Sequence, residues 1–213
     1  MRQSDRMESY RTALDVLWAH GLLYACTCNR RDIAAATTAP QEGAEPPVGP
    51  DGIIYPGTCR DAGHPREDGA LRLDMAKALK RIEGTPLSFT ENGHGPTGET
   101  GEITISPDQL IRSVGDVVLA RRDMGTSYHL SVVIDDAAQG ITLVTRGADL
   151  FDATYIHIVL QALLELPKPS YHHHHLIRDE AGRRLAKRDD ARAIALYREN
   201  GATPEDIRSM IGL

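Results

Sequence analysis

The sequence lacks the features of a membrane protein and of a secreted protein. None of its apolar runs approaches the roughly 20 residues that a helix needs to cross a bilayer. The first residues, MRQSDRMESYRTALDVL, contain no apolar signal core. The chain has only three cysteines, an odd number that cannot close a disulfide framework. We therefore expect a cytoplasmic protein without a membrane anchor.

An excess of positive charge is also absent. The formal net charge of the 213 residues is -6, so the composition does not predict a nucleic-acid-binding protein, although a local basic face is compatible with it. Hydrophobic residues make up 41% of the chain and charged residues 25%, which is typical of a globular protein. The length is sufficient for one large domain or for a domain with an insertion.

Hydrophobic periodicity predicts an α/β protein, with strands and helices alternating in the second half. Residues 34–52 and 91–101, rich in glycine and proline, are predicted to be irregular loops. The predicted strands lie in LLYACT, GALRLDM, GDVVLARRD, HLSVVIDDA and GITLVTRGADL. The predicted helices cover residues 5–20, a segment capped by Asp152, a segment through Arg198, and a last short segment that Thr203 caps.

The three cysteines are spaced in a way that suggests a metal site. Cys26 and Cys28 are two residues apart, so in a strand their thiols point to the same side. Cys59 follows the proline- and glycine-rich loop and could return to the same point. Thiolates select zinc, which takes four ligands in structural sites. Histidine is the usual partner of cysteine and nominates His64 as the fourth ligand. Tyr55 is the less usual candidate, because a phenol has a pKa of about 10. Three unrelated cysteines are the alternative.

Several segments together resemble a known enzyme family. The most specific are YHLSVVIDDAAQGITLVTRGADL and the pattern C-x-C…Y-x3-C. They resemble the catalytic core of the glutamyl-tRNA synthetase family of class I aminoacyl-tRNA synthetases, and most closely its short branch without an anticodon-binding domain. The resemblance covers nearly the whole chain. It implies an α/β fold with a Rossmann-like catalytic core, N-terminally incomplete, and a zinc-binding insertion.

The resemblance also implies a division of the chain and a ligand set. Residues 1–21 would be a helix of the catalytic core, residues 22–110 the zinc-bearing insertion that resembles an acceptor-stem-binding domain, and residues 111–213 the second half of the core. The zinc ligands would be Cys26, Cys28, Tyr55 and Cys59, so the resemblance favours tyrosine over His64. A monomer is expected for the full-length protein.

The segment GRRLAKRDD occupies the place of the lysine-rich signature that class I synthetases use on ATP. By this resemblance Lys187 matches the second lysine of the signature and would act on the phosphates in catalysis. Arg184 and Arg188 would also bind ATP, with Mg²⁺ as the expected counter-ion. Cations suit a triphosphate whose charge grows at the leaving pyrophosphate. A solvated, basic helix start is the alternative.

Two residues match positions that contact the amino acid in this family. Arg146 ends an apolar strand, and its guanidinium can bind a carboxylate of glutamate through two hydrogen bonds. Tyr128, placed here at the start of the preceding strand, offers a hydroxyl. The alternative for Arg146 is a structural ion pair with Asp135, Asp136 or Asp149. For Tyr128 it is a half-buried core aromatic.

The run YHHHHLI, residues 171–177, lies inside the chain, and we interpret it as native sequence and not as a tag. We expect it to be an extended segment. Its histidines would then face alternate sides, His172 and His174 on one and His173 and His175 on the other. We favour a role in lining the ATP site over a second metal site.

One expected motif is missing. The chain contains no His-x-Gly-His-type sequence, which in the family follows the first strand of the core and helps to bind ATP. We therefore expect a family member that lacks its first strand–helix units. We also expect the 213-residue chain not to form glutamyl-adenylate, because positioning fails when one side of the site is missing.

The function implied by the resemblance is activation of glutamate with ATP and transfer of the glutamyl group to queuosine in the anticodon of tRNA(Asp). Two alternatives are a catalytic fragment of a glutamyl-tRNA synthetase and a non-catalytic zinc module that binds tRNA.

Overall fold

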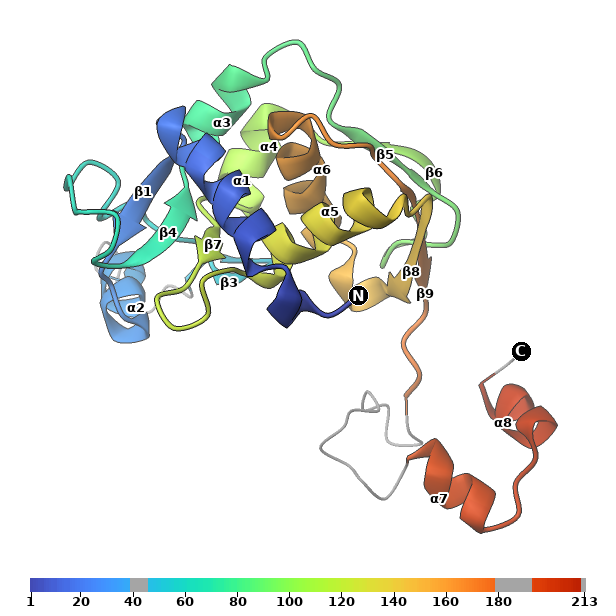
Figure 1. Cartoon of the computed structure of the whole chain (residues 1–213). Coiled ribbons are helices and arrows are strands. Elements are labelled where there is room, and N and C mark those ends of the chain that lie inside the picture. The colour runs from blue at the N-terminus through green and yellow to red at the C-terminus, as the bar shows by residue number, and fades with distance from the viewer. Residues whose placement is uncertain (39–45, 179–192, 212–213) are drawn as a thin grey trace.

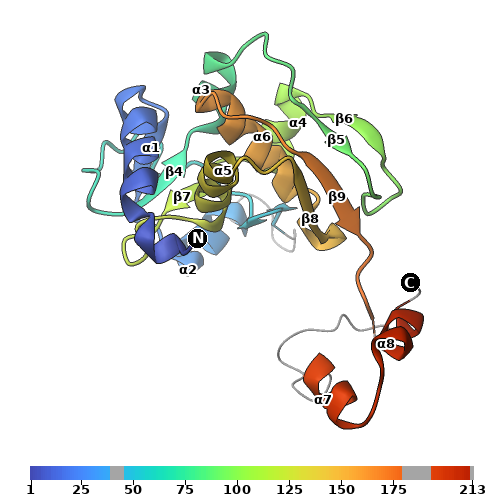
Figure 2. The ribbon, with the colours of Figure 1, turned by 45° about the vertical axis from the view of Figure 1, so that its right-hand side comes forward.

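Two sheets with helices packed between them form the body of the protein, which confirms the expected α/β class. The computed structural model describes residues 1–38, 46–178 and 193–211. In Figures 1 and 2 the two sheets lie at opposite sides of the body, and helices α5 (Tyr128–Gln139) and α6 (Ala153–Leu163) run between them.

The first sheet is antiparallel and has the strand order β1-β4-β7. Its strands are β1 (Leu23–Cys26), β4 (Ala70–Leu73) and β7 (Val118–Ala120). The predicted first helix is observed as α1 (Met7–Ala19), which buries Tyr10, Ala13, Leu14 and Leu17 at helical spacing. The hydroxyl of Tyr10 donates a 2.6 Å hydrogen bond to Asp135, so α1 is fastened to α5.

The second sheet has the order β6-β5-β9-β8. Strands β8 (Leu143–Gly147) and β9 (Ser170–His174) are parallel, and Arg146 lies opposite His173 in their register. Strand β5 (Ser88–Glu91) runs parallel to β9 and antiparallel to β6 (Gly101–Thr104). The residues between β5 and β6 are irregular, as predicted, but the hairpin around them was not predicted.

The remaining elements are short and connect or cover the sheets. They are η1 (Gln3–Asp5), α2 (Arg30–Thr38), β2 (Val48–Gly49), β3 (Gly52–Ile53), α3 (Met75–Arg81), α4 (Pro107–Ser113), η2 (Ala148–Leu150), α7 (Ile194–Glu199) and α8 (Pro204–Met210). Thr203 and Asp206 form the predicted capping box of α8. In both views α7 and α8 lie beyond the end of β9, apart from the layered body (Figures 1 and 2).

The strand predicted in HLSVVIDDA was wrong, because this segment forms α5. Ser127 caps the helix by accepting a hydrogen bond from the backbone N–H of Leu130, and Gly140 ends it in the left-handed conformation. Tyr128 therefore begins a helix and not a strand. A short apolar run such as VVI does not by itself distinguish a buried strand from a buried helix.

Two smaller predictions also need correction. The loop predicted over residues 34–52 begins too early, because its first residues belong to helix α2. This helix starts at the side chain of Asn29, which accepts hydrogen bonds from the backbone N–H groups of Arg31 and Asp32. Asp152 stands at the N-cap of α6 but makes no capping hydrogen bond with its side chain, since its backbone is already helical.

The predicted division at residue 110 cuts across both sheets. Strand β4 pairs with β7, and strand β5 pairs with β9, in each case across that residue. The two boundaries between the three predicted segments stay a prediction. Among the described residues, no helix is both long and apolar enough to span a membrane.

Candidate functional site

The three cysteines converge on one point, together with Tyr55. Their sulfur atoms all lie within 4.8 Å of one another. Sγ of Cys28 is 3.4 Å from Sγ of Cys59, and the Tyr55 hydroxyl is 3.3 Å from Sγ of Cys26 and 3.4 Å from Sγ of Cys28. All three cysteines are free thiols. We call Cys26, Cys28, Cys59 and Tyr55 the thiol cluster.

The spacing within the thiol cluster fits a tetrahedral zinc ion. Zinc–sulfur bonds of about 2.3 Å place two tetrahedral sulfurs about 3.8 Å apart. A zinc–oxygen bond of about 2.0–2.2 Å places the oxygen about 3.5–3.7 Å from each sulfur. The observed separations of 3.3–3.4 Å are slightly shorter than these edges. A small increase in these three separations would therefore suit the ion.

The position of the fourth donor distinguishes the two candidates from the sequence. Tyr55 is 4% exposed, and its hydroxyl also accepts a 2.9 Å hydrogen bond from the backbone N–H of Cys59. The ring of His64 instead lies 3.4 Å from the hydroxyl of Thr27, and no histidine or carboxylate of the described residues joins the three thiols as a candidate metal-binding group. The geometry therefore favours Tyr55 as the fourth ligand.

The surroundings of the thiol cluster favour the anionic form of Cys59, whereas burial raises the pKa of the Tyr55 phenol. The guanidinium of Arg72 lies 4.0 Å from the centre of the Tyr55 ring. Burial opposes a thiolate at Cys59, but hydrogen bonds from Tyr55 and from the backbone of Thr27 outweigh it and lower the pKa of this thiol to about 6. Burial raises the pKa of Cys28 to about 11. A bound cation would favour deprotonation of both thiols.

A second group of side chains surrounds Arg146, near the end of β8. Its guanidinium donates hydrogen bonds to the Thr154 hydroxyl at 2.6 Å, to Nε2 of His173 at 3.0 Å and to Nδ1 of His157 at 3.3 Å. A longer contact of 3.4 Å reaches the hydroxyl of Tyr128. We call Arg146, Tyr128, Thr154, His157 and His173 the arginine cluster. It brings together the two residues that the sequence analysis assigned to glutamate.

The arginine cluster does not contain the ion pair considered as an alternative for Arg146. No carboxylate of the described residues lies within salt-bridge distance of its guanidinium. Asp135, one of the three candidates, pairs with Arg6 at 3.2 Å and with Tyr10. The hydrogen-bond partners of Arg146 are a hydroxyl, a phenol and two imidazoles. Within the described part of the chain no carboxylate therefore forms an ion pair with Arg146, although its charge acts to lower the pKa of Asp136, which burial raises.

The two imidazoles beside Arg146 are held in the neutral form. Burial lowers the pKa of His157 well below its usual value, and the charge of Arg146 lowers it further. Burial also lowers the pKa of His173, against the opposing effect of its hydrogen bond with Glu91. Both rings can therefore accept hydrogen bonds from the guanidinium at neutral pH.

A cleft of about 920 Å³ lies at the carboxyl ends of β8 and β9. Ligands bind at this edge of a parallel sheet. The lining includes residues 92–96, Asp149, Asp152 and the four histidines 172–175. In β9 His173 is buried with Tyr171, whereas His174 is exposed, as predicted; His175, which was predicted on the side of His173, follows the strand and is exposed. Lys187, Arg184 and Arg188, which the sequence analysis assigned to ATP, lie outside the described residues.

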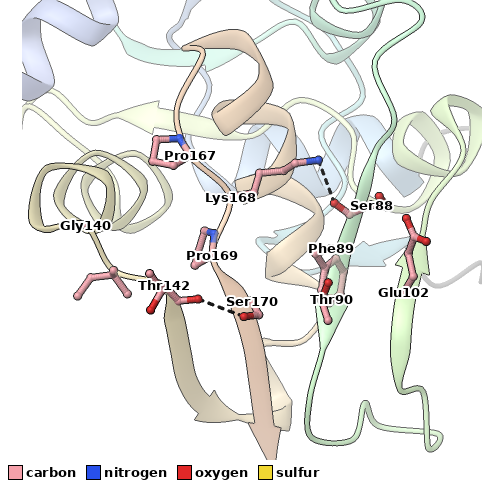
Figure 3. A pocket seen from close by; sticks show the side chains of 11 residues that line it. Ser88, Phe89, Thr90, Glu102, Gly140, Thr142, Pro167, Lys168, Pro169 and Ser170 are labelled. Carbon is pink, nitrogen blue, oxygen red and sulfur yellow. Dashed lines mark hydrogen bonds between the residues drawn. The ribbon is translucent and has the colours of Figure 1, made fainter.

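Another depression, of about 510 Å³, lies at the opposite ends of β8 and β9. Figure 3 shows its lining, with Lys168 reaching across to the backbone carbonyl of Ser88 at 3.4 Å. Pro167, Pro169 and Thr142 form another part of the wall. None of the described residues assigned to zinc or glutamate lines this depression.

Comparison with known proteins identifies the family. Residues 98–213 match the catalytic domain of the class I tRNA synthetases (E and Q). Over all 213 residues the chain is 60% identical to the glutamyl-Q tRNA(Asp) synthetase of Rhodobacter capsulatus. The chain belongs to the glutamyl-Q tRNA(Asp) synthetase family. A second member, from Pseudomonas syringae pv. tomato, is 40% identical over 187 residues.

The chain spans only part of its relatives. It covers 75% of the R. capsulatus glutamyl-Q tRNA(Asp) synthetase and 53% of the one from P. syringae. The glutamate-tRNA synthetase of Elizabethkingia anophelis is similar in structure, with a TM-score of 0.67 and 20% identity, over the whole chain and 45% of that protein. At this identity the likeness shows the shared fold alone.

Three residues in or beside these clusters were missed by sequence reasoning: Thr154, His157 and Arg72. Thr154 and His157 lie three residues apart on the buried face of α6, which was read only for its apolar residues. The sequence does contain one signal for these two residues: a threonine and a histidine are polar residues within an otherwise apolar helix face. Arg72 lies in a strand read as alternating, where an arginine between two leucines looks exposed, but it is 9% exposed.

Proposed function

We propose that the protein activates glutamate with ATP and transfers the glutamyl group to queuosine in the anticodon of tRNA(Asp). The observation that carries this proposal is the 60% identity over the whole chain to a glutamyl-Q tRNA(Asp) synthetase. The arginine cluster supports it, because Arg146 and Tyr128 stand together and His173 of the same cluster lines the cleft at the carboxyl edge of the parallel strands.

The proposed reaction has two steps. A carboxylate oxygen of glutamate attacks the α-phosphate of ATP, and pyrophosphate leaves. A hydroxyl of the queuosine cyclopentenediol then attacks the activated carbonyl, and AMP leaves. Arg146 binds a carboxylate of glutamate, and Tyr128 donates a hydrogen bond to the same substrate. Lys187, with Arg184, Arg188 and Mg²⁺, stabilises the charge that develops on the leaving pyrophosphate.

We also propose one structural zinc ion bound by Cys26, Cys28, Tyr55 and Cys59. When bound, zinc crosslinks β1 to the segment after β3 and stabilises the fold without taking part in the chemistry. The converging donors and the nearby guanidinium of Arg72 support this assignment. In the Tyr55→Phe variant the zinc affinity should fall, whereas His64→Ala should leave it unchanged. A reversed pattern, measured by competition with a chelator, would assign the fourth position to histidine.

The test of the reaction uses the protein as its gene encodes it, including any residues beyond these 213. ATP–pyrophosphate exchange with glutamate measures the first step. Transfer of radiolabelled glutamate is then compared among tRNA(Asp) with queuosine, tRNA(Asp) without it, and tRNA(Glu). Label on the first RNA alone is the expected result. Label on tRNA(Glu) would support a glutamyl-tRNA synthetase, and binding of tRNA without exchange would support a non-catalytic module.

The glutamate assignment has its own test. Arg146→Ala removes a charge-assisted hydrogen bond worth about 1.5–3 kcal/mol, which corresponds to a loss of glutamate affinity of about 10- to 150-fold. The KM for ATP should change much less. An equal rise in both constants would contradict the assignment of Arg146 to glutamate.

A further inference from the structure

Two histidines support the guanidinium of Arg146 from different elements. His173, the neighbour of Arg146 in the register of β8 and β9, accepts from Nε at 3.0 Å. His157, on α6, accepts from one terminal nitrogen at 3.3 Å. Both side chains are almost fully buried, at 1% and 2% exposure. A guanidinium has no acceptor atoms, so each ring must present an unprotonated nitrogen to it.

The proton on His173 is fixed by Glu91. One carboxylate oxygen of this buried residue lies 2.5 Å from Nδ1 of His173. The other accepts from the backbone N–H groups of Gly93 at 2.7 Å and of His173 at 2.9 Å. Since a carboxylate only accepts, Nδ1 must carry the proton and Nε2 must be bare. Glu91 thereby sets the tautomer that Arg146 requires.

A similar chain leads away from His157. Its Nδ1 accepts from Arg146, so its Nε2 carries the proton and donates to Nδ1 of His129 at 3.2 Å. The proton of His129 then resides on Nε2, which lies 3.7 Å from a carboxylate oxygen of Asp51. Nε2 of His157 thus faces an acceptor nitrogen of His129, and the contact from His129 to Asp51 is longer than a hydrogen bond. Both chains end at a carboxylate that does not itself touch Arg146.

We propose that His157 and His173 are positioning residues, which hold Arg146 in one orientation for a carboxylate of the substrate, and that Glu91 is essential because it fixes the tautomer of His173. This inference rests on the proposed function, in which Arg146 binds glutamate. Neutral acceptors orient the guanidinium without neutralising it. An aspartate or glutamate in their place would compete with the substrate for the same hydrogen bonds.

The variant Glu91→Gln tests the role of the tautomer with an almost unchanged shape. The two backbone N–H groups hold the amide oxygen of the new side chain where the first carboxylate oxygen stood. The amide NH₂ then faces Nδ1 of His173 and donates to it. The proton of His173 must move to Nε2, where it opposes the N–H of Arg146. The control is Glu102→Gln, the same substitution on the exposed strand β6 of the same hairpin.

Two measurements on the protein as its gene encodes it separate the possible outcomes. Histidine ¹⁵N chemical shifts report the tautomer without any substrate. ATP–pyrophosphate exchange reports KM for glutamate and for ATP. In Glu91→Gln we expect the shifts of the two His173 nitrogens to exchange and KM for glutamate to rise about tenfold or more, with KM for ATP within about twofold. The control should match the parent protein in both measurements.

Two matched substitutions of His173 keep the inference testable if the Glu91→Gln variant fails to fold. His173→Gln places an amide oxygen near the position of Nε2 and should retain most of the glutamate affinity. His173→Leu removes the acceptor and should lose about tenfold or more. Equal KM values for glutamate in the two variants, or a parent His173 protonated on Nε2, would overturn the inference and leave the proposed function intact. A parent protein without glutamate-dependent exchange would overturn the proposed function itself.

Discussion

The thiol cluster and the arginine cluster favour opposite charges at their centres. In the thiol cluster three sulfurs and a phenol oxygen converge, and each must lose a proton to bind a cation well. In the arginine cluster a permanent cation is surrounded by acceptors that remain neutral. The first arrangement is suited to a metal ion and the second to a carboxylate. A list of hydrogen-bond partners therefore does not by itself define a site. The thiol cluster and the arginine cluster are distinguished by which of their side chains carry a charge.

The largest effect is expected from breaking the thiol cluster. Cys59→Ser removes a ligand that cannot be replaced by a neighbouring histidine, because no histidine of the described residues lies with the three sulfurs. Zinc content should fall from about one ion per chain to near zero, and the unfolding free energy should drop by about 4 kcal/mol or more. Elemental analysis and chemical denaturation measure the two quantities. A variant that keeps its zinc would contradict the ligand assignment.

The second effect concerns the geometry of the arginine cluster. Arg146→Lys keeps the charge but loses the planar arrangement of donors that serves Thr154, His157 and His173 at once. We expect glutamate affinity to fall by a factor that corresponds to about 2 kcal/mol. The measurement is KM for glutamate in pyrophosphate exchange, with KM for ATP as the internal control. Retention of full affinity would mean that charge alone suffices at this position.

A third, smaller effect is a loss of stability in mild acid. His157 and His173 have pKa values below the usual 6.5 in the folded protein, so below that pH the unfolded chain binds more protons than the folded one. Their contribution to stability is complete above about pH 6.5 and is lost as the pH falls, by up to about 1.4 kcal/mol per pH unit for each ring. Arg146, His129, Glu91 and His172 are the charged or titratable groups that face them.

Denaturation at a series of pH values between about 5 and 7.5 measures this slope. His157→Asn keeps an acceptor near the position of Nδ1 but cannot be protonated, so it should reduce the slope. A slope in this variant equal to that of the parent would assign the acid sensitivity to other groups.

The smallest effect is expected at the edge of the arginine cluster. Tyr128 is 46% exposed, and its contact with Arg146 is long, at 3.4 Å. Tyr128→Phe should therefore weaken glutamate binding by only about 0.5–1.5 kcal/mol, the value of one neutral hydrogen bond. Stability should be unchanged within error. A loss as large as that of Arg146→Lys would show that the hydroxyl binds the substrate more directly than the guanidinium does.

The two clusters also differ in how far they could be predicted from the sequence. The thiol cluster lies within 34 residues and has a spacing pattern, so its four members could be named from the sequence alone. The spacing left Tyr55 and His64 open, the family resemblance favoured Tyr55, and the geometry favours the same residue. The arginine cluster gathers residues from α5, β8, α6 and β9, and its contacts depend on how these elements pack. Arg146 and Tyr128 were named through the family resemblance, whereas Thr154 and His157 show no pattern that distinguishes them from other buried polar residues.

The fold was predictable where a residue has a strong local preference. The capping box at Thr203 and the apolar face of α1 are examples. Prediction failed at α5, where the choice between helix and strand depends on the Ser127 cap and on packing against α1 and α6. It also missed the local β5–β6 hairpin, and it did not foresee the strand order β6-β5-β9-β8, which pairs segments far apart in the chain, such as those of Glu91 and Tyr171.

Gly93 is a position where even a single added methyl group would have a large effect. Its backbone does not require glycine for conformational reasons, since it is absent from the residues with positive φ. A Cβ atom there would collide with the backbone carbonyl oxygen of His173. In a library of all single substitutions, position 93 would therefore be nearly intolerant, although it lies outside both clusters. At Gly98 an added Cβ would meet nothing within 4 Å, but its φ of 93° would strain any other residue, so there the backbone conformation and not a collision favours glycine. A map of variant effects would thus mark the close approach of this segment to the backbone of His173 in β9.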